Sequence, residues 1–299
     1  MNEDRQKLLP LLVHIQANLD GDLSLAALSR KAGLSPSHFH RSFKAAIGET
    51  PRDYVARLRV ERGAFRLLLH DAKLVDVALD CGFQNHETFI RAFRRVFGKT
   101  PGEYREWIRR QVFKRNHQAR ETSAQVGSAF ELSPTKMVHL RSMHLAFLRH
   151  IGPYESVPDT LFDDLERWAV RRLMQGPRVW LGIGHDAPIA TPPELLRFDA
   201  ALVVPGPFEP DGHIGYQKLG GAEFAVTTHV GSFETLPAAY AAIFPRVIAL
   251  LGYRMIGLPA VEIYHAARVN AQLRLNQTDI YLPVTRCSTD AGVRKRIRQ

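Results

Sequence analysis

Two segments of the chain resemble each other closely, and this internal repeat limits the folds that the chain can adopt. Residues 39–54 match residues 89–104 at a constant offset of 50. The matched positions include two phenylalanines, a glycine, a Thr-Pro pair and a tyrosine in each copy. Upstream, Gly33 matches Gly82 at an offset of 49, so the second turn is one residue longer than the first. The chain is therefore predicted to contain two copies of one small helical unit.

Each copy has the pattern of two helices joined by a tight turn. In the first copy Gly33 ends a helix-forming stretch, because glycine adopts a left-handed conformation without a steric penalty. A serine at position 35 or 37 then caps the next helix, since its side chain can accept a hydrogen bond from a free backbone N–H. We expect the apolar residues of this second helix to line one buried face at helical spacing. They are Phe39, Phe43, Ala46 and Ile47 in the first copy, and Phe89, Phe93, Val96 and Phe97 in the second.

A long helix is predicted between the two copies. It begins at Thr50-Pro51 and extends to about Leu69, which gives a rigid rod of roughly 27 Å. Such a rod would hold the two capped helices about one DNA turn apart, in successive major grooves on one side of a duplex. Arginines recur along it, and we expect them to be exposed: Arg52, Arg57, Arg59, Arg62 and Arg66.

The positive charge of the chain is concentrated in this repeated region. Residues 1–120 contain 22 lysines and arginines against 13 aspartates and glutamates, which accounts for +9 of the net charge of +10. Residues 121–299 contain 18 against 17. A basic segment joined to a neutral one indicates that the first part binds a polyanion and the second does not.

A second repeat, unrelated to the first, lies in the rest of the chain. Residues 149–155 resemble residues 228–234 at an offset of 79, and residues 199–204 match residues 279–284 at an offset of 80. Each copy combines one amphipathic stretch with strand-like segments. The amphipathic stretches are 159–174 and 236–251, and the strand-like segments are 178–184, 198–204, 261–265 and 278–284. This pattern predicts two β-α-β-β units.

Together the repeats predict a multidomain chain with an all-α domain followed by an α+β domain. The all-α domain, residues 1–112, would contain two helix-turn-helix units joined by a long helix. The α+β domain, residues 136–285, would contain the duplicated β-α-β-β units. Residues 113–135 are polar and aperiodic, which is typical of a linker. The basic tail, residues 286–299, is predicted to be disordered.

The first repeat resembles a known family. The pattern AGLSPSHFHRSFKAAIGETPRDYVARLR, followed by VALDCGFQNHETFIRAFRRVFGKTPGEYR, is similar to the AraC/XylS transcription regulators. The resemblance covers residues 8–112 and implies that the second helix of each unit reads bases in the major groove. By position, the base-contacting residues would be Ser37, His38, His40 and Arg41 in the first unit, and His86, Glu87 and Arg91 in the second. Arginine suits guanine O6 and N7, and a glutamate accepts a hydrogen bond from cytosine N4.

Other cations on these helices are better suited to the DNA backbone. Lys44, Arg94, Arg95 and Lys99 are predicted to contact phosphates, which supply affinity without sequence information. Glu87 has an alternative interpretation, because it lies four residues before Arg91 and can orient that side chain without touching a base.

The order of the two domains resembles the Rob-like branch of the family. The second domain is similar to the GyrI-like effector-binding fold in the motifs HIGPYE, HVGSFE, VEIY and TDIYLPV. This resemblance implies a pocket between two pseudo-symmetric halves, where an acid ringed by aromatic side chains accepts a lipophilic cation. The matching acid is Glu262. The candidate aromatic residues are Tyr154, Trp180, Phe224, Tyr264 and Tyr281.

Glu262 also has an alternative interpretation. Its counterpart in the repeat is Ile183, in an apolar strand, so Glu262 would be a carboxylate on an apolar surface, which is costly unless it is paired. Alternatively, Glu262 faces solvent or pairs with an arginine, and the aromatic residues simply form the core. Asp279 is a weaker second acid, because its counterpart is also an aspartate, which suggests a structural role.

The sequence therefore predicts a sequence-specific transcription activator with a small-molecule sensing domain. Two alternatives stay open. One is a constitutive DNA binder whose second domain docks a protein partner. The other is a second domain that hydrolyses a small reactive compound with Glu262 and Tyr264, which share a strand face. The predicted partners are double-stranded DNA, a small-molecule effector and, by the resemblance, RNA polymerase.

No catalytic site, metal site or cofactor is predicted, because the sequence has no P-loop, G-x-S-x-G, HExxH or paired CxxC motif. The longest apolar runs are too short for a membrane span, and the first residues do not form a signal peptide. With only two cysteines, of which Cys81 is expected in the core, we predict a cytoplasmic, nucleoid-associated protein.

Overall fold

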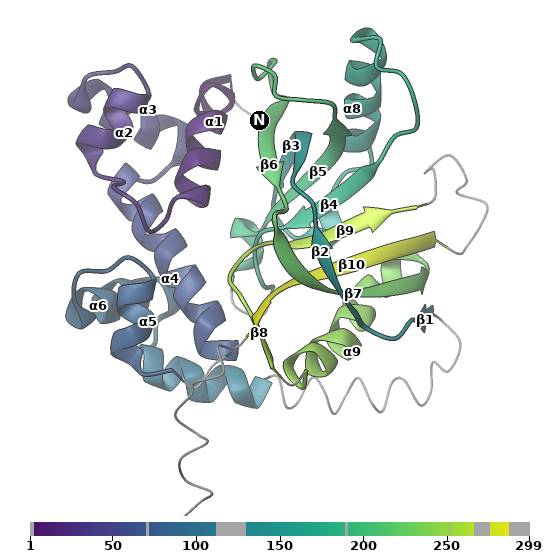
Figure 1. Cartoon of the computed structure of the whole chain (residues 1–299). Helices are drawn as coiled ribbons and strands as arrows, with labels where there is room; N and C mark the ends of the chain where they lie inside the picture. Colours follow the sequence, from purple (N-terminus) through teal and green to yellow (C-terminus); the bar gives the residue numbers. More distant parts are fainter. Residues whose placement is uncertain are drawn as a thin grey trace, which may run out of the picture. The chain divides into compact units, whose positions relative to one another are not determined.

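The computed structural model describes residues 3–69, 72–111, 130–188, 191–250, 252–265 and 276–286 (Figure 1). Its contacts divide the chain into two compact units. Unit 1 comprises residues 1–114 and 142–219, and unit 2 comprises residues 115–141 and 220–299. The first part of the predicted α+β domain therefore belongs to the same compact unit as the helices.

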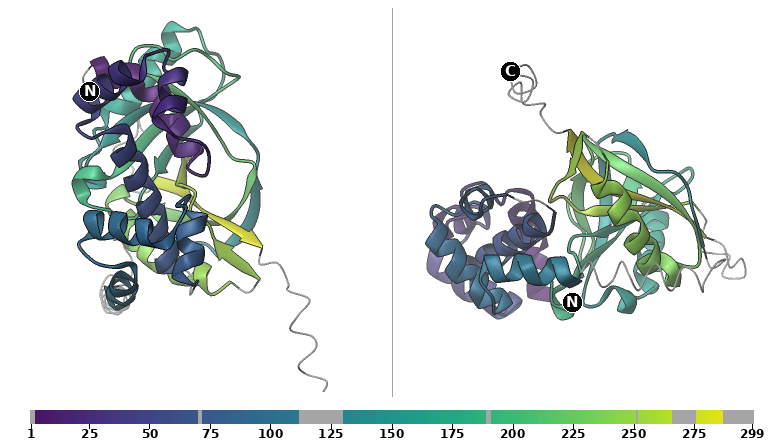
Figure 2. Two further views of the ribbon diagram at one scale, coloured as in Figure 1. Left: turned by 90° about the vertical axis from the view of Figure 1, so that its left-hand side faces the viewer. Right: turned by 90° about the horizontal axis from the view of Figure 1, so that it is seen from below.

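Unit 1 begins with helices, two pairs of which are connected by one long helix. The left view in Figure 2 shows this helix, α4, running from one helix pair to the other. The helices are α1 (Glu3–Ala17), α2 (Leu25–Lys31), α3 (Pro36–Ile47), α4 (Pro51–Leu69), α5 (Leu74–Asp80) and α6 (His86–Phe97), followed by a helix over residues 101–111. The predicted long helix thus ends at the expected residue.

Local capping explains where the helices of each pair begin and end. The Ser35 side chain accepts a hydrogen bond from the backbone N–H of His38, and the Asn85 side chain accepts one from Thr88. The helices α3 and α6 both end at a glycine in the left-handed conformation, Gly48 with φ 91° and Gly98 with φ 66°. A side chain would be strained at these two positions. Of the two predicted caps for α3, the serine at position 35 is the one that the structure uses.

Each helix pair has its own apolar core, and these cores confirm the predicted buried faces. Phe39 and Phe43 of α3 are fully buried against residues of α1, α2 and α4. Phe89 and Phe93 of α6 are fully buried in the second core, which also contains Cys81. The remaining apolar residues of the two predicted faces are partly buried against these cores: Ala46, Ile47, Val96 and Phe97.

A glycine allows α4 to approach the second helix pair. A Cβ atom added at Gly63 would lie 2.9 Å from Cε2 of Phe89. This distance is shorter than an ordinary van der Waals contact, so the absence of a side chain at Gly63 lets the Phe89 ring pack directly on the α4 backbone.

The prediction that the α4 arginines are exposed is wrong for most of them; only Arg52 is exposed. Arg57 forms ion pairs with Glu49 and Glu61, and Arg59 donates to the carbonyl of Leu19. Arg62 pairs with Asp20, and Arg66 pairs with Asp80. The partners of Arg59, Arg62 and Arg66 lie outside α4, in other segments of the chain, so helical periodicity alone did not indicate them. These arginines hold the helices together instead of facing solvent.

The rest of unit 1 is an antiparallel sheet with the strand order β4-β5-β3-β6. Its elements are β3 (Met143–Ile151), η1 (Tyr154–Ser156), α8 (Thr160–Arg171), β4 (Trp180–Gly184), η2 (Pro193–Leu195), β5 (Arg197–Val204) and β6 (Gly215–Leu219). The helix α8 packs on the sheet through Phe162, Leu165 and Trp168, which are buried. Gly215 of β6 lies close to Leu9 of α1, so the first helix also contacts this sheet.

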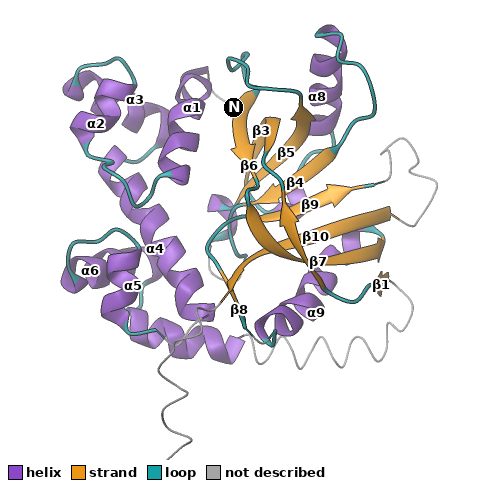
Figure 3. Cartoon of the chain, viewed as in Figure 1, coloured by secondary structure: helices purple, strands orange, loops and turns teal. Residues whose placement is uncertain are grey.

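In unit 2 the antiparallel strands β9, β10, β7 and β1 follow one another (Figure 3). In addition, β2 pairs with β7, and β8 pairs with β10. Its elements are β1 (Phe130–Leu132), β2 (Lys136–Leu140), β7 (Ala222–Gly231), η3 (Phe233–Thr235), α9 (Leu236–Ile248), β8 (Tyr253–Met255), β9 (Ala260–Tyr264) and β10 (Asn276–Arg286).

The predicted linker and tail lie mostly outside the described residues. Residues 130–132, at the end of the predicted linker, form β1, because Phe130–Leu132 pairs with the end of β7. The residue Arg286, which begins the predicted tail, is the last residue of β10. None of the helices that the structure describes is long and apolar enough to cross a membrane.

Candidate nucleic-acid interface and small-molecule site

The outward face of α3 carries most of the side chains predicted to read DNA in the first helix pair. Ser37, His38, Arg41 and Lys44 are exposed, and His40 is half-buried. Phe39 and Phe43 fix the rotation of this helix, because both rings are fully buried on its other face. The arrangement leaves hydroxyl, imidazole, guanidinium and ammonium groups free to meet a ligand surface.

The outward face of α6 is similar, but two of its predicted residues are placed differently. Glu87, Arg91 and Arg94 are exposed. His86 is half-buried, and its Nε2 atom is buried with no hydrogen-bond partner in the described part of the chain. Lys99 is half-buried, with its ammonium group 5.9 Å from the centre of the Trp107 ring.

Two further contacts concern the charged residues of α6. Arg95 is largely exposed but lies 2.9 Å from Oδ1 of Asp53, at the start of α4. A hydrogen bond from Thr50 and the charge of Arg95 hold the pKa of Asp53 below its usual value. Glu87 forms no ion pair with Arg91 within the described ranges. The structure therefore does not show the alternative in which Glu87 orients that arginine.

A separate cluster surrounds Glu262, on β9 of unit 2. The hydroxyl of Tyr240 donates to Oε1 of Glu262 at 2.9 Å, and the hydroxyl of Tyr264 donates to Oε2 at 2.6 Å. The ring of Phe233 meets that of Tyr264 edge to face at 5.5 Å. Burial raises the pKa of Glu262, although the two tyrosine hydrogen bonds oppose this effect. No described lysine, arginine or histidine forms an ion pair with this carboxylate.

Two of the other predicted aromatic residues, Phe224 and Tyr281, lie in unit 2 but do not surround the Glu262 carboxylate. Directly opposed residues of antiparallel strands share a sheet face. Glu262 is opposite Ile280, whereas Tyr281 is opposite Val261 and therefore faces the other side. Phe224 packs against Tyr281 at 6.0 Å and lies on that same opposite side. The sequence thus identified Glu262 and Tyr264 together but missed Tyr240 and Phe233.

Signals for the two missed residues exist in the sequence. Phe233 occupies the position in HVGSFE that Tyr154 occupies in HIGPYE. Tyr240 lies on the predicted amphipathic helix 236–251. Helical periodicity gave no reason to prefer Tyr240 over its neighbours, because the distance to Glu262 depends on how α9 packs on the sheet.

The remaining predicted aromatic residues, Tyr154 and Trp180, lie in unit 1. The Tyr154 hydroxyl donates to the carbonyl of Asp186 at 2.8 Å and accepts from the backbone N–H of the same residue at 3.1 Å. The Trp180 ring packs edge to face on Phe162 of α8 at 5.9 Å. In unit 1, therefore, Tyr154 braces the segment that follows β4, and Trp180 contributes to the packing of α8.

Buried charges connect α4 and α1 to the sheet of unit 1. Glu61 of α4 lies near Arg197 of β5, which is also paired with Asp186. Nearby, Asp199 accepts hydrogen bonds from Arg149 Nε at 2.6 Å and from Gln217 at 2.9 Å. Arg149 also donates to the side-chain carbonyl of Gln16, on α1, at 2.9 Å. No sequence pattern indicated these contacts.

The two units contain histidine–aspartate pairs at corresponding positions. His185 Nε2 lies 2.7 Å from Oδ2 of Asp199, and His265 Nε2 lies 2.8 Å from Oδ2 of Asp279. The two pairs are separated by the 80-residue offset of the second repeat. Asp279 also accepts a hydrogen bond from Thr228 at 2.6 Å, so it is engaged within its sheet.

The fold and these sites define a class of protein, a helix-turn-helix DNA-binding protein with an appended small-molecule binding domain. A family described as a helix-turn-helix domain matches residues 28–106, and a family described as a GyrI-like small molecule binding domain matches residues 133–285, about half of the chain. The chain belongs to the AraC family of transcription regulators and carries a GyrI-like domain after its helix-turn-helix domain.

Individual relatives match the helical part. The Right origin-binding protein of Escherichia coli is 37% identical over 100 residues, which cover 32% of this chain and 35% of that protein. The regulatory protein SoxS of Escherichia coli is 32% identical over 95 residues, which cover 32% of this chain and 89% of SoxS. The chain thus spans about a third of the length of the Right origin-binding proteins that it matches. A structure of EcmrR in a DNA complex covers 88% of this chain and 99% of EcmrR, with 15% identity and a TM-score of 0.45.

Proposed function

We propose that this chain is a sequence-specific transcription activator that binds duplex DNA through α3 and α6 and responds to a lipophilic cation bound at Glu262. In this proposal each helix pair, α2 with α3 and α5 with α6, is a helix-turn-helix unit, and the domain boundaries are those predicted from the sequence. RNA polymerase would be the protein partner.

The observation that carries the DNA-binding proposal is the pair of amphipathic helices with matched caps and matched exposed arginines. Arg41 of α3 and Arg91 of α6 are both exposed, and each lies nearly two turns after the N-cap of its helix. Arginine in this position suits the major-groove edge of guanine. Ser37, His38, His40, His86 and Glu87 are the proposed accompanying base contacts. Lys44, Arg94 and Arg95, which are exposed, are the proposed phosphate contacts; Lys99, which the sequence suggested as a fourth, is half-buried over the Trp107 ring and is left out of this set.

A binding experiment tests this proposal directly. Duplexes recovered by the purified chain from a random pool should share a consensus with two half-sites about one helical turn apart. Affinity for such a duplex should fall steeply as salt concentration rises, because phosphate contacts release counterions. Recovery of no consensus, or a salt-independent affinity, would contradict the proposal.

The observation that supports a cationic ligand is the unpaired carboxylate of Glu262. It accepts two tyrosine hydrogen bonds and has no cation near it among the described residues. A partly buried carboxylate in this state gains from a positively charged ligand, and the rings of Tyr264 and Phe233 can add cation–π attraction. Tyr240 replaces Phe224 and Tyr281 in the proposed site, because those two residues face the other side of the sheet.

Thermal unfolding with a panel of compounds tests the ligand proposal. Lipophilic quaternary ammonium compounds should raise the unfolding temperature, and neutral isosteres of the same size should not. The shift should be lost in Glu262→Gln. The matched control is Glu223→Gln, which removes a more exposed carboxylate from the same unit. Equal shifts with neutral and cationic compounds would contradict the proposal.

A further inference from the structure

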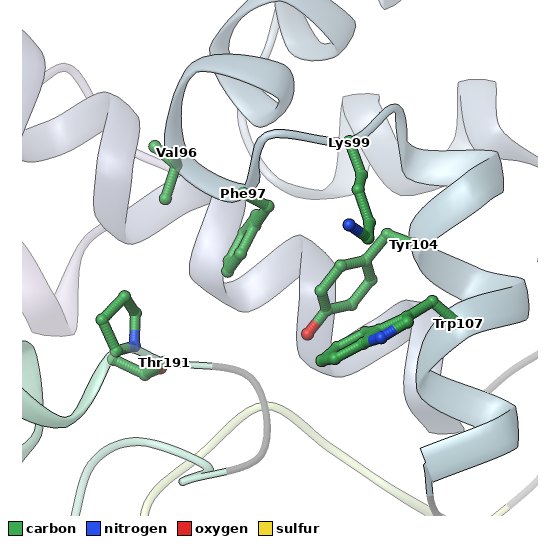
Figure 4. A pocket seen from close by; sticks show the side chains of 7 residues that line it. Val96, Phe97, Lys99, Tyr104, Trp107 and Thr191 are labelled. Atoms are coloured by element: carbon green, nitrogen blue, oxygen red, sulfur yellow. The ribbon is translucent and has the colours of Figure 1, made fainter.

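A cavity of about 290 Å³ lies in unit 1 beside the end of α6 (Figure 4). It is lined by Val96, Phe97, Lys99, Tyr104, Trp107, Thr191 and Pro192. Figure 4 shows three aromatic side chains around it, with the Tyr104 hydroxyl pointing between Phe97 and Trp107 toward the side of Thr191. Its volume lies near the lower end of the range for ligand pockets, about 300–1,000 Å³, which suits a molecule of one or two rings.

Two polar groups at this cavity lack the partners that they would normally have. Tyr104 is 2% exposed, and its hydroxyl has no hydrogen-bond partner among the described residues. Burial raises the pKa of this phenol, which therefore stays a hydrogen-bond donor at neutral pH. Lys99 is half-buried and forms no ion pair in the ranges that the structure describes. The nearby carboxylate of Glu103 accepts hydrogen bonds from the backbone and side chain of Thr100.

The first helix pair shows how the same positions are satisfied within the protein. Tyr54, which is 50 residues before Tyr104, accepts a hydrogen bond from the side chain of Gln16 at 3.3 Å. Arg57 lies over the Tyr54 ring at 5.1 Å and pairs with Glu49. At the same offset, Lys99 replaces Glu49 and Trp107 replaces Arg57. The second helix pair therefore has a cation and an extra aromatic ring where the first has an internal acid–base pair.

We propose that this cavity binds a small aromatic carboxylate. The carboxylate of this ligand would accept hydrogen bonds from the Lys99 ammonium and the Tyr104 hydroxyl. The aromatic ring would pack against Phe97 and Trp107, with Val96 and Pro192 completing an apolar wall. This site is separate from Glu262 and selects the opposite ligand charge.

Calorimetric titration of the full chain with indole-3-carboxylate and with indole-3-carboxamide tests the proposal. The carboxylate should bind about tenfold or more tightly than the neutral amide, because only the carboxylate forms charge-assisted hydrogen bonds. Lys99→Met retains the apolar stem of the side chain and should weaken carboxylate binding by about tenfold or more. Tyr104→Phe should weaken it by several-fold. Lys136→Met, at an exposed lysine of β2, is the matched control and should leave binding unchanged.

Specific outcomes would overturn the proposal. They are equal binding of the amide and the carboxylate, no binding of either compound, or undiminished carboxylate binding by Lys99→Met. Loss of carboxylate binding in Glu262→Gln would place the compound in the other site and would also overturn it. Without ligand, Tyr104→Phe should unfold at a temperature no lower than the native chain, because it removes an unpartnered buried hydroxyl. A large decrease would mean that the hydroxyl has a structural partner, which would equally overturn the proposal.

Discussion

The carboxylate of Glu61 on α4 and the guanidinium of Arg197 on β5 face each other in a buried contact, with Oε2 and Nη2 3.6 Å apart. Only 5% of the Glu61 side chain and 11% of the Arg197 side chain are exposed. Arg197 is also paired with Asp186, so it contributes to the charge balance of two buried carboxylates, and Glu61 has Arg57 as a second partner. The helix that joins the two helix pairs is thus attached to the sheet of unit 1 through charge.

Replacing Arg197 should therefore destabilise the chain strongly. Arg197→Met keeps an apolar side chain but leaves Glu61 and Asp186 buried without this cation, which should cost about 3–5 kcal/mol in the free energy of unfolding. Urea denaturation measures this change. Arg286→Met is the control, because Arg286 is mostly exposed where it pairs with Glu223, and it should change stability by at most about 1 kcal/mol. Similar losses in the two variants would contradict the prediction.

Two glycines should respond to alanine in opposite directions. Gly63→Ala would place a Cβ atom 2.9 Å from the Phe89 ring and should destabilise the chain by about 1–3 kcal/mol through overpacking. Gly102, in the helix over residues 101–111, has no atom within 4 Å of an added Cβ. Gly102→Ala should stabilise the chain by about 0.4–1 kcal/mol, because alanine restricts the unfolded chain and favours the helix. Thermal unfolding of both variants checks the signs.

The proposed division of roles in DNA binding predicts two different mutant behaviours. Arg91→Ala should lose roughly 1–3 kcal/mol of binding free energy and relax the preference at one base pair. Lys44→Ala should weaken binding to all sequences about equally and reduce the salt dependence. Affinities for a selected duplex and its single-base variants, each at several salt concentrations, distinguish these effects. If both variants lost the same base preference, the division would be wrong.

Binding of a lipophilic cation at Glu262 should depend on pH. Burial raises the pKa of Glu262, so the carboxyl ionises at a higher pH than an ordinary glutamate. The cation favours the ionised form, and affinity should therefore increase as pH rises through this raised pKa, with release of a proton on binding. Calorimetry in buffers of different ionisation enthalpy measures the released proton. Glu262→Gln should bind weakly and without this pH dependence, whereas a pH-independent native affinity would refute the prediction.

Asp199 should make the chain sensitive to acid. Arg149 and His185 lower the pKa of this buried carboxyl, despite the opposing effect of burial. A group with a lowered folded-state pKa contributes stability above its unfolded-state pKa, about 3.9, and this stability is lost as pH falls below that value. Urea midpoints between pH 7 and pH 2 should show this decline. In Asp199→Asn the decline should be smaller and the stability at pH 7 lower, because Arg149 is left buried without its carboxylate.

The helices of the first part could be predicted well because their signals are local. The cap at Ser35 and the spacing of Phe39 and Phe43 lie within one short segment. The same holds for the ends of α4, which the Thr-Pro pair and the length of the helical pattern indicated. The groups that several α4 side chains contact, in contrast, are far away in the sequence. Arg59 and Arg62 bind groups at residues 19–21, about 40 positions away in the sequence, so periodicity predicted exposure where the fold provides partners.

The cluster around Glu262 shows the same limit. Alternation along β9 correctly placed Glu262 and Tyr264 on one face, because that relationship depends only on a period of two. Assigning Phe224 and Tyr281 to the same cluster required the register between β7, β10 and β9, which the sequence did not provide. The partner on α9, Tyr240, depends on how that helix lies across the sheet.

The anchoring of α4 has a consequence for the DNA that the chain can recognise. Arg62 pairs with Asp20 and Arg66 pairs with Asp80, so α4 is attached to segments that precede and follow it in the sequence. Its 19 residues form one continuous helix. Because the length of α4 is fixed, the distance between the two helix pairs that it joins is fixed as well. Inserting one base pair between two half-sites turns one of them by about 34–36° and moves it about 3.4 Å further along the duplex. With α3 and α6 reading one half-site each, as proposed, the protein would then have to give up one half-site or bend the DNA. Its operators should therefore tolerate base changes better than changes in spacing.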